Sequence, residues 1–279
     1  MNDFLAVFEY QFFRQAIAAA ILISILAAMV GTYIVSRKIV FISGGITHAS
    51  FGGIGMAYYF GINPFAGAAV FAVLTAAGIE WISQKGKVRE DSAIAILWSL
   101  GMALGIIFVF MTPGYAPNLM SFLFGSILSV GITDIYLLMA FSLIILLCFA
   151  IFFRPILYTA FDPEFAKVMG LPVAAFRYLM SVIIALSIVI SIRSIGIILV
   201  LSIFTIPQIT AMLFTRNFAY IIPLAALWGI IGSVSGLLAA YVLDIPSGAS
   251  IIFFLTIQFL VIKFIFLLRS HIKTRYRNP

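Results

Sequence analysis

Charged residues are scarce in this chain. They make up 9% of its 279 residues, whereas hydrophobic residues make up 64%. Soluble domains carry about 25% charged and about 45–50% apolar residues. A surface this poor in charge cannot be covered mainly by water, so the chain is predicted to be an integral membrane protein.

Alternating patterns of the barrel type are also missing. A membrane-spanning strand appears as about ten alternating residues, whereas a helix needs about 20 consecutive apolar residues. The long, unalternating apolar runs predict an all-α polytopic membrane protein with about nine transmembrane helices. No repeat or linker divides the chain, so residues 1–279 are expected to form a single transmembrane domain. The predicted spans are 16–36, 39–60, 64–83, 92–111, 132–153, 175–192, 195–215, 219–242 and 247–268.

Several chemical motifs are absent. Cys148 is the only cysteine, which excludes an internal disulfide. No Gly-x-x-x-x-Gly-Lys-Ser/Thr phosphate loop occurs, so the chain is not expected to hydrolyse ATP itself. There is no nucleophile elbow or zinc-protease helix, and the two histidines, His48 and His271, do not build a catalytic metal site. A catalytic function is therefore not expected.

The positive charges are unevenly distributed. Across alternate connections, 14 of the 16 Lys and Arg residues fall on one side of the predicted spans, and only Arg14 and Arg193 fall on the other. Cytoplasmic loops carry such an excess, so that side is predicted to be cytoplasmic, with the N-terminus outside and the C-terminus inside. Because topology explains the net charge of +7, no nucleic-acid partner is expected.

One predicted outer connection, residues 112–131, is long and still apolar. It contains Pro113, Gly114 and Pro117, followed by the apolar residues 119–125. The segment is too short to span the membrane and too apolar to lie in water. We expect a re-entrant half-helix that dips in from outside.

A compact polar insert, residues 161–173, lies between the fifth and sixth predicted spans on the basic side. It starts with Asp162-Pro163 and stops at Gly170, with Pro172 two residues later. Proline at the start and glycine at the stop are typical of a short helix. From these residues alone, the insert is either a solvated loop or a helix presented to a cytoplasmic partner.

His48 is the sharpest candidate within the membrane, because ionisable side chains there usually face a cavity or a partner. By helical spacing, Gly44, Gly45, Gly52 and Gly55 share its face, which therefore lacks other side chains. Such a face can line a pathway. Alternatively, the glycines can let two helices pack closely while His48 bonds to a neighbouring carbonyl.

Two further residues stand out by position. Asp244 is a carboxylate at a predicted outer turn that also contains Pro246, so it is either a turn residue or part of an outer mouth. Pro207 lies inside the seventh apolar run and is expected to kink that helix, either as a hinge or as plain packing.

The remaining small and acidic residues favour structural roles. Gly101-x-x-x-Gly105 and Gly232-x-x-x-Gly236 are predicted to be close-packing faces. The acidic residues beside the basic loop after the third span are expected to be solvated or paired; they are Glu80, Glu90 and Asp91.

Several ordered motifs together resemble the permease subunits of bacterial zinc and manganese ATP-binding-cassette importers, the ZnuB, MntB and TroC group. The likeness runs along most of the chain. The motifs are residues 47–50 (THAS) with 61–65 (GINPF), 119–125 (LMSFLFG), 164–172 (EFAKVMGLP), 196–211 and 245–249 (IPSGA).

The resemblance implies a type II importer-like permease in the bacterial cytoplasmic (inner) membrane. It implies a non-catalytic subunit that carries zinc or manganese without a tightly bound cofactor, while a separate ATPase subunit uses the ATP. It also implies a permease homodimer and an extracytoplasmic metal-binding protein. With this family in view, the candidate site residues are His48 and Asp244 for the metal pathway and Pro207 as hinge, and the resemblance implies Asp162, Glu164, Ala166, Gly170 and Pro172 for coupling to the ATPase.

The chain departs from this family at three positions. Gly44 stands where the family usually has Asp, Ser126 where Asp is frequent, and Gln208 where Ala is usual. The two missing carboxylates favour, as an alternative, a related permease for a metal chelate or cobalamin-like cargo. An ion-gradient-driven transporter or channel, and more remotely a membrane enzyme, are alternatives of other classes. A gradient-driven carrier is expected to hold more ionisable groups at mid-membrane than His48 alone.

Overall fold

The computed structural model describes residues 7–113 and 126–275, and within them every regular element is a helix. The all-α prediction is confirmed. Most of the segment expected to form a half-helix, residues 112–131, lies outside the described residues, and its described part contains only the short 3-10 helix η2. In chain order the elements are η1 (Val7–Glu9), α2 (Gln11–Ser36), α3 (Phe41–Tyr59), α4 (Pro64–Lys85), α5 (Glu90–Met111), η2 (Ile127–Ser129), α7 (Ile132–Phe161), α8 (Pro163–Val168), α9 (Val173–Ile195), α10 (Ile197–Ile203), α11 (Ile206–Met212), α12 (Phe218–Leu243) and α13 (Ser247–Arg275).

Seven of the described helices are long and apolar enough to cross a membrane: α2, α4, α5, α7, α9, α12 and α13. This confirms a multi-pass membrane protein but differs from the predicted count of nine. Helix α3 has 19 residues and is not among the seven, because its glycines and polar residues lower its hydropathy. The predicted span 195–215 contains two short helices, α10 and α11, in place of one long helix.

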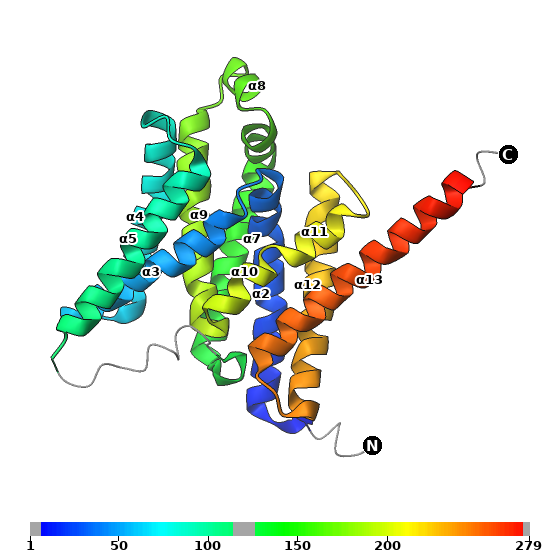
Figure 1. The fold of residues 1–279 in the computed structure, drawn as a ribbon, viewed down its shortest axis with the longest axis horizontal. Helices are drawn as coiled ribbons and strands as arrows, with labels where there is room; N and C mark the ends of the chain where they lie inside the picture. The colour runs from blue at the N-terminus through cyan, green and yellow to red at the C-terminus, as the bar shows by residue number, and fades with distance from the viewer. Residues whose placement is uncertain (1–6, 114–125, 276–279) are drawn as a thin grey trace.

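The long helices run back and forth between two ends of the bundle (Figure 1). One end, named the α8 end below, carries α8, the α2–α3, α4–α5 and α11–α12 connections, and the C-terminal part of α13. The opposite end carries the start of α2 and the α12–α13 turn. The basic residues of these connections, such as Arg37, Lys87, Lys167 and Arg216, therefore gather at one end, as the alternation of charge predicted.

Glycines bring α3 into direct backbone contact with α5. A Cβ atom placed on Gly52 would lie 2.7 Å from the carbonyl oxygen of Gly101, and one placed on Gly101 would lie 2.6 Å from the Cα of Ala49. Gly105 meets α3 in the same way, at the carbonyl oxygen of Phe51. Small residues allow helix backbones to approach this closely. The close-packing role predicted for Gly101 and Gly105 is therefore confirmed.

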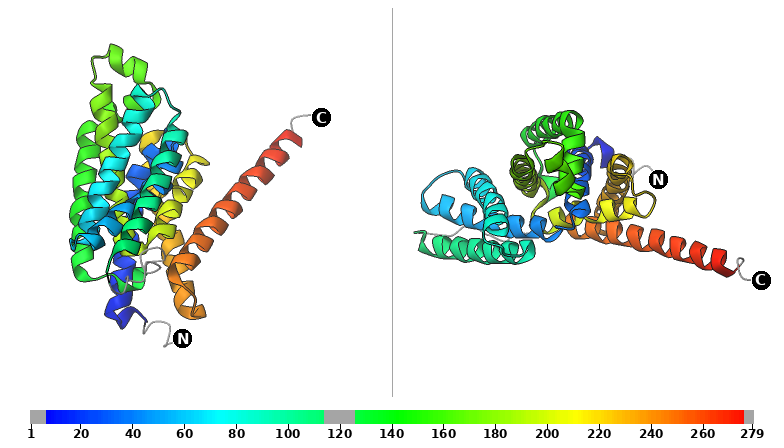
Figure 2. Two further views of the ribbon diagram at one scale, coloured as in Figure 1. Left: turned by 60° about the vertical axis from the view of Figure 1, so that its left-hand side comes forward. Right: turned by 90° about the horizontal axis from the view of Figure 1, so that it is seen from above.

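The second small-residue pair joins α12 to α13. A Cβ atom on Gly236 would lie 2.5 Å from the Cα of Ile251, and one on Gly232 would collide with the side chain of Leu255. Beyond this contact α13 leaves the bundle and projects away from it, as both views of Figure 2 show. Large apolar side chains of α13 consequently remain exposed; they include Phe253, Leu260 and Phe264.

Three interruptions shape the helices. Helix α7 continues past the predicted span end at residue 153 and bends at Phe152, three residues before Pro155. A proline inside a helix removes a hydrogen bond and produces such a bend. Gly196 has a φ of +78° and turns the chain from α9 into α10. The third interruption separates α10 from α11 at Phe204 and Thr205.

Candidate functional site

His48 lies in the middle of α3 at the junction with α5 and α10. Its half-buried imidazole stacks on the indole of Trp98 from α5, with ring centroids 4.7 Å apart and an interplanar angle of 6°. One turn earlier, a Cβ atom on Gly44 would lie 3.8 Å from Leu201 of α10 and 3.9 Å from Trp98. These are ordinary van der Waals distances, so Gly44 leaves room beside His48.

The other three glycines on the predicted His48 face pack against neighbouring helices. Gly45 meets Ile94 of α5, Gly52 meets Gly101, and Gly55 meets the backbone of Gly105. Of the two alternatives for this face, close helix packing therefore applies to these three glycines. Helical spacing does not show which neighbouring helix packs on each glycine. It therefore could not predict that Gly44 alone of the four has free space beside it.

No preformed metal cluster surrounds His48 in the part of the chain that the structure describes. That part contains no group of three or more His, Cys, Asp and Glu side chains arranged to hold a metal ion. His48 offers one imidazole, and Gly44 supplies no ligand one turn away. A bare cation at this position would need water or a further chain to complete its coordination.

Asp244 is an exposed residue at the end of the bundle opposite the α8 end. It lies at the end of α12, whereas His48 lies on α3. It ends α12 in the left-handed conformation, with a φ of +52°, and the backbone N–H of the next residue, Ile245, donates to the carbonyl of Ala240. Asp is one of the few residues that adopt this conformation readily. The structure thus explains Asp244 as a turn residue, and its carboxylate is free to face solvent.

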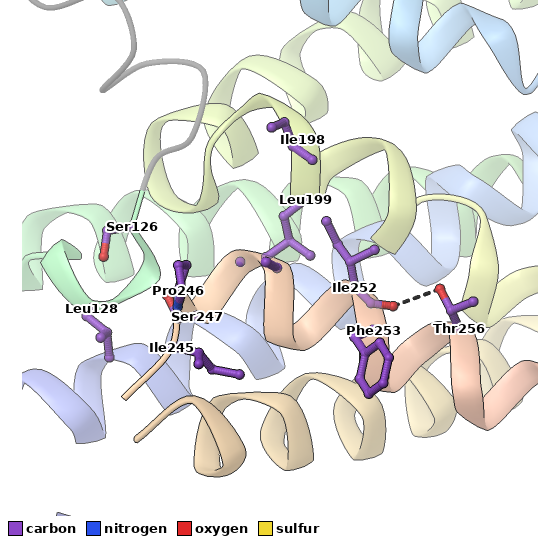
Figure 3. Close-up of a pocket in the computed structure, with 12 residues that line it drawn as sticks. Ser126, Leu128, Ile198, Leu199, Ile245, Pro246, Ser247, Ile252, Phe253 and Thr256 are labelled. Atoms are coloured by element: carbon purple, nitrogen blue, oxygen red, sulfur yellow. Dashed lines mark hydrogen bonds between the residues drawn. The ribbon is translucent and has the colours of Figure 1, made fainter. Parts of the chain in front are cut away.

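A pocket of about 620 Å³ lies beside this turn (Figure 3). It is lined by Ser126 and by the IPSGA motif at 245–249. Its walls are mostly apolar, and the hydroxyl of Thr256 is engaged with the carbonyl of Ile252 at 2.8 Å. The pocket is therefore no site for a bare ion. Its other lining residues are Leu128, Ile198, Leu199 and Phe253.

A buried ionic cluster ties four helices together near the α8 end. Arg37, just after α2, lies 3.4 Å from Glu80 of α4 and 3.4 Å from Glu90 of α5. Glu80 also accepts hydrogen bonds from Gln84 at 2.7 Å and from Ser181 of α9 at 3.3 Å. These carboxylates were expected to be solvated or paired; Glu80 is paired, but only 2% of its side chain is exposed, so it is a core residue.

Arg37 keeps its positive charge in this cluster. Burial acts to lower the pKa of its guanidinium, but the neighbouring Tyr33 and Glu90 outweigh burial, and the pKa is raised overall. The cluster was not identified from the sequence. The one available signal was the placement of Glu80 within the apolar run 64–83, because a carboxylate at such a depth requires a partner.

The predicted insert forms the short helix α8, which is capped at both ends. Asp162 accepts a hydrogen bond from the backbone N–H of Phe165 at 2.9 Å, and Pro163 occupies the first turn. Gly170 has a φ of +75° and closes the helix, with its N–H donating to the carbonyl of Lys167. The next N–H returns to the carbonyl of Ala166 at 3.0 Å, which completes a Schellman cap. The helix is therefore set by its own sequence.

Most of the α8 residues that the sequence motif singled out are not the ones that the helix exposes. Ala166 is fully buried, Asp162 and Gly170 build the two ends of α8, and Pro172 is the N-cap of α9. Glu164 is exposed and pairs with Lys167 at 2.8 Å. The exposed apolar residues were not singled out from the sequence: Val168 is 86% exposed and Met169 is 60% exposed.

The predicted kink at Pro207 is a complete helix break that occurs two residues before the proline. Helix α10 ends at Ile203, and α11 begins at Ile206, so the buried Pro207 stands in the first turn of the new helix. Proline is tolerated there because the first-turn N–H groups have no partner within the helix.

Comparison with known proteins gives one consistent family. The family model described as "ABC 3 transport family" matches residues 9–266. The manganese transport system membrane protein MntC of Halalkalibacterium halodurans is 35% identical over 268 residues, which cover 96% of this chain and 91% of the relative. The manganese import system permease protein ScaB of Streptococcus gordonii is 32% identical, with 96% of each chain covered.

A solved structure agrees with these relatives. A chain of PsaBC from Streptococcus pneumoniae, determined in complex with a Fab, superposes with a TM-score of 0.82 at 33% identity. The match covers 94% of this chain and 94% of that one. The helix order described above is therefore shared along nearly the whole chain.

Proposed function

The chain belongs to the ABC 3 transport family, and from this membership we propose that it is the membrane permease subunit of an ATP-driven importer of a divalent transition metal, manganese in preference to zinc. The names of the relatives, MntC and ScaB, support manganese. The observation that carries the proposal is α8, a separately capped helix at the basic end of an otherwise apolar bundle. A chain without a phosphate loop of its own needs such a contact to use ATP.

In this proposal α8 docks on a separate ATPase subunit. The exposed Val168 and Met169 provide the apolar part of the contact, and Glu164 with Lys167 provides its charged rim. Movement of α8 during ATP binding and hydrolysis passes to α7 and α9, which it joins directly. The permease itself carries out no catalysis.

The charge distribution supports an orientation in the bacterial inner membrane. The α8 end faces the cytoplasm, because it gathers the basic connections, and the C-terminus lies on that side. The N-terminus and the α12–α13 turn with Asp244 lie outside, where an extracytoplasmic metal-binding protein delivers the cargo. Asp244 then contributes a carboxylate at the outer mouth, and Pro207 marks the place where the α10–α11 segment changes direction.

A second permease copy completes the pathway. The arrangement that supports this is the incomplete ligand set around His48 together with the exposed apolar length of α13. Two copies that face each other would bring two imidazoles and waters to one ion, which can be released because it is held weakly. The His48, Gly44 and Leu201 surface is the proposed lining.

Uptake of radiolabelled manganese into proteoliposomes tests the proposal. The vesicles contain the permease with its ATPase and binding protein, and zinc is added as a competitor. We expect manganese uptake that requires ATP inside the vesicles and that persists in the presence of equimolar zinc. Uptake driven by an ion gradient without ATP, or uptake of zinc alone, would contradict the proposal.

A further inference from the structure

Gln208 is a fully buried polar residue that connects three helices. It lies in α11, and its side-chain Nε2 donates to the carbonyl of Ala27 on α2 at 2.7 Å and to the carbonyl of Ile203 at the end of α10 at 3.3 Å. One amide group therefore joins both halves of the broken helix to α2.

The second of these bonds compensates for Pro207. In a continuous helix, the carbonyl of Ile203 would accept the N–H of the residue four positions later, and that residue is Pro207, which has none. A buried carbonyl left without a donor destabilises the fold. The Nε2 of Gln208 approaches this carbonyl from the next residue along the chain.

Helix α2 is shaped to receive this side chain. Gly31 lies one turn after Ala27 on the same face of α2. A Cβ atom on Gly31 would lie 2.6 Å from Nε2 of Gln208 and 2.5 Å from the carbonyl oxygen of Phe204, within the break itself. The absence of a side chain at Gly31 is thus what allows the break and the amide to approach α2.

Burial of the Gln208 amide is also unfavourable in one respect that an apolar side chain would avoid. Its Oε1 is buried and finds no hydrogen-bond partner among the described residues. A leucine would fill a similar volume without burying that oxygen. What Gln208 adds to the structure is therefore its pair of donated hydrogen bonds.

We propose that Gln208 is a positioning residue that clamps the α10–α11 break onto α2. Helix α10 then moves together with α2 and does not pivot freely at Pro207. This matters for the pathway because Leu201 of α10 lies against Gly44, one turn from His48. The clamp stands on geometry alone, whereas its consequence for transport rests on the proposed function.

Hydrogen exchange of the full-length permease in lipid nanodiscs tests the clamp. In the Gln208→Leu variant, we expect amide exchange over residues 204–213 to rise by roughly threefold to tenfold, the loss that one net hydrogen bond produces. The matched control is Gln258→Leu, since Gln258 also donates through Nε2 to a helix carbonyl, that of Trp228 at 3.1 Å. The control should leave residues 204–213 unchanged. Unchanged exchange in Gln208→Leu, or an equal rise in the control, would overturn the clamp.

A double-mutant cycle decides the matter if Gln208→Leu folds poorly. Gly31→Ala should raise exchange at the break by displacing the amide. The same change should do less in a Gln208→Ala background, because the displaced group is already gone. Strictly additive effects would show that Gly31 and Gln208 do not act together and would overturn the clamp.

The transport readout is separate. In the reconstituted complex, Gln208→Leu should lower manganese uptake several-fold while Gln258→Leu does not. Raised exchange with normal uptake would overturn the positioning role in transport. If the wild-type complex carries no manganese, the proposed function fails, and the exchange result still decides whether the clamp exists.

Discussion

Arg37 and Glu80 form an ion pair at 3.4 Å that is almost fully withdrawn from solvent, across the junction between α2 and α4. The pair extends through Ser181 to α9, the helix that directly follows α8. Helix α3, which carries His48, begins a few residues after Arg37. The cluster thus connects the helix next to the proposed motor contact with the helices that surround His48.

Replacing Arg37 by Met should destabilise the permease strongly. The change leaves Glu80 buried without its cation, which typically costs about 3–5 kcal/mol. Denaturant titration of the purified protein in detergent measures the loss. A matched control is Arg89→Met, since Arg89 is 84% exposed and its pairing with Asp91 lies in solvent.

The control should leave the free energy of unfolding unchanged. The double variant Arg37→Met with Glu80→Gln should recover part of the loss, because the unpaired charge is removed as well. If Arg37→Met were as stable as the wild type, the cluster would have no structural role.

Gly44→Asp should be tolerated, whereas Gly45→Asp should not. Gly44 has ordinary contact distances around its Cβ position, but a Cβ on Gly45 collides with Ile94. An aspartate at 44 would place a carboxylate one turn before His48, on the same helical face. We expect the folded Gly44→Asp variant to bind manganese measurably more tightly in isothermal titration calorimetry. Equal expression and stability of the two variants would contradict the close packing of Gly45 on Ile94.

His48→Phe separates the chemistry of the ring from its packing. A phenyl ring can keep the stack on Trp98 but has no nitrogen to contact a cation. Manganese uptake should fall by at least tenfold while expression and melting temperature stay near the wild-type values. Normal uptake by His48→Phe would show that His48 serves only in packing and does not contact the cation.

Local rules made much of this fold predictable. The nine apolar segments all contain helix, and α8 begins and ends where Pro163 and Gly170 indicated, because caps and turns are set by neighbours in sequence. The surroundings of individual side chains were harder to predict from the sequence. Which of the glycines around His48 stays open depends on the position of Ile94, a residue of another helix. The hydrogen bond beside the break before Pro207 likewise involves another helix, because Gln208 donates to a carbonyl of α2.

The exposed residues of α8 show the same limit. The motif drew attention to Asp162, Ala166 and Gly170, which build α8, and to Pro172, which caps α9. The exposure of Val168 and Met169 could not be predicted from the motif, because it depends on how α8 is oriented on α7 and α9.

The proposed contact of α8 with the ATPase is tested most directly by the ratio of manganese imported to ATP hydrolysed. Val168→Asp should lower this ratio at least fivefold in the reconstituted complex without changing the stability of the permease, because Val168 is 86% exposed. Val168→Ile is the matched control and should retain coupling. Glu164→Ala combined with Gly170→Ala should also uncouple, since a left-handed residue other than glycine strains the cap. An unchanged ratio in Val168→Asp and in the double variant would show that α8 is not the contact with the ATPase.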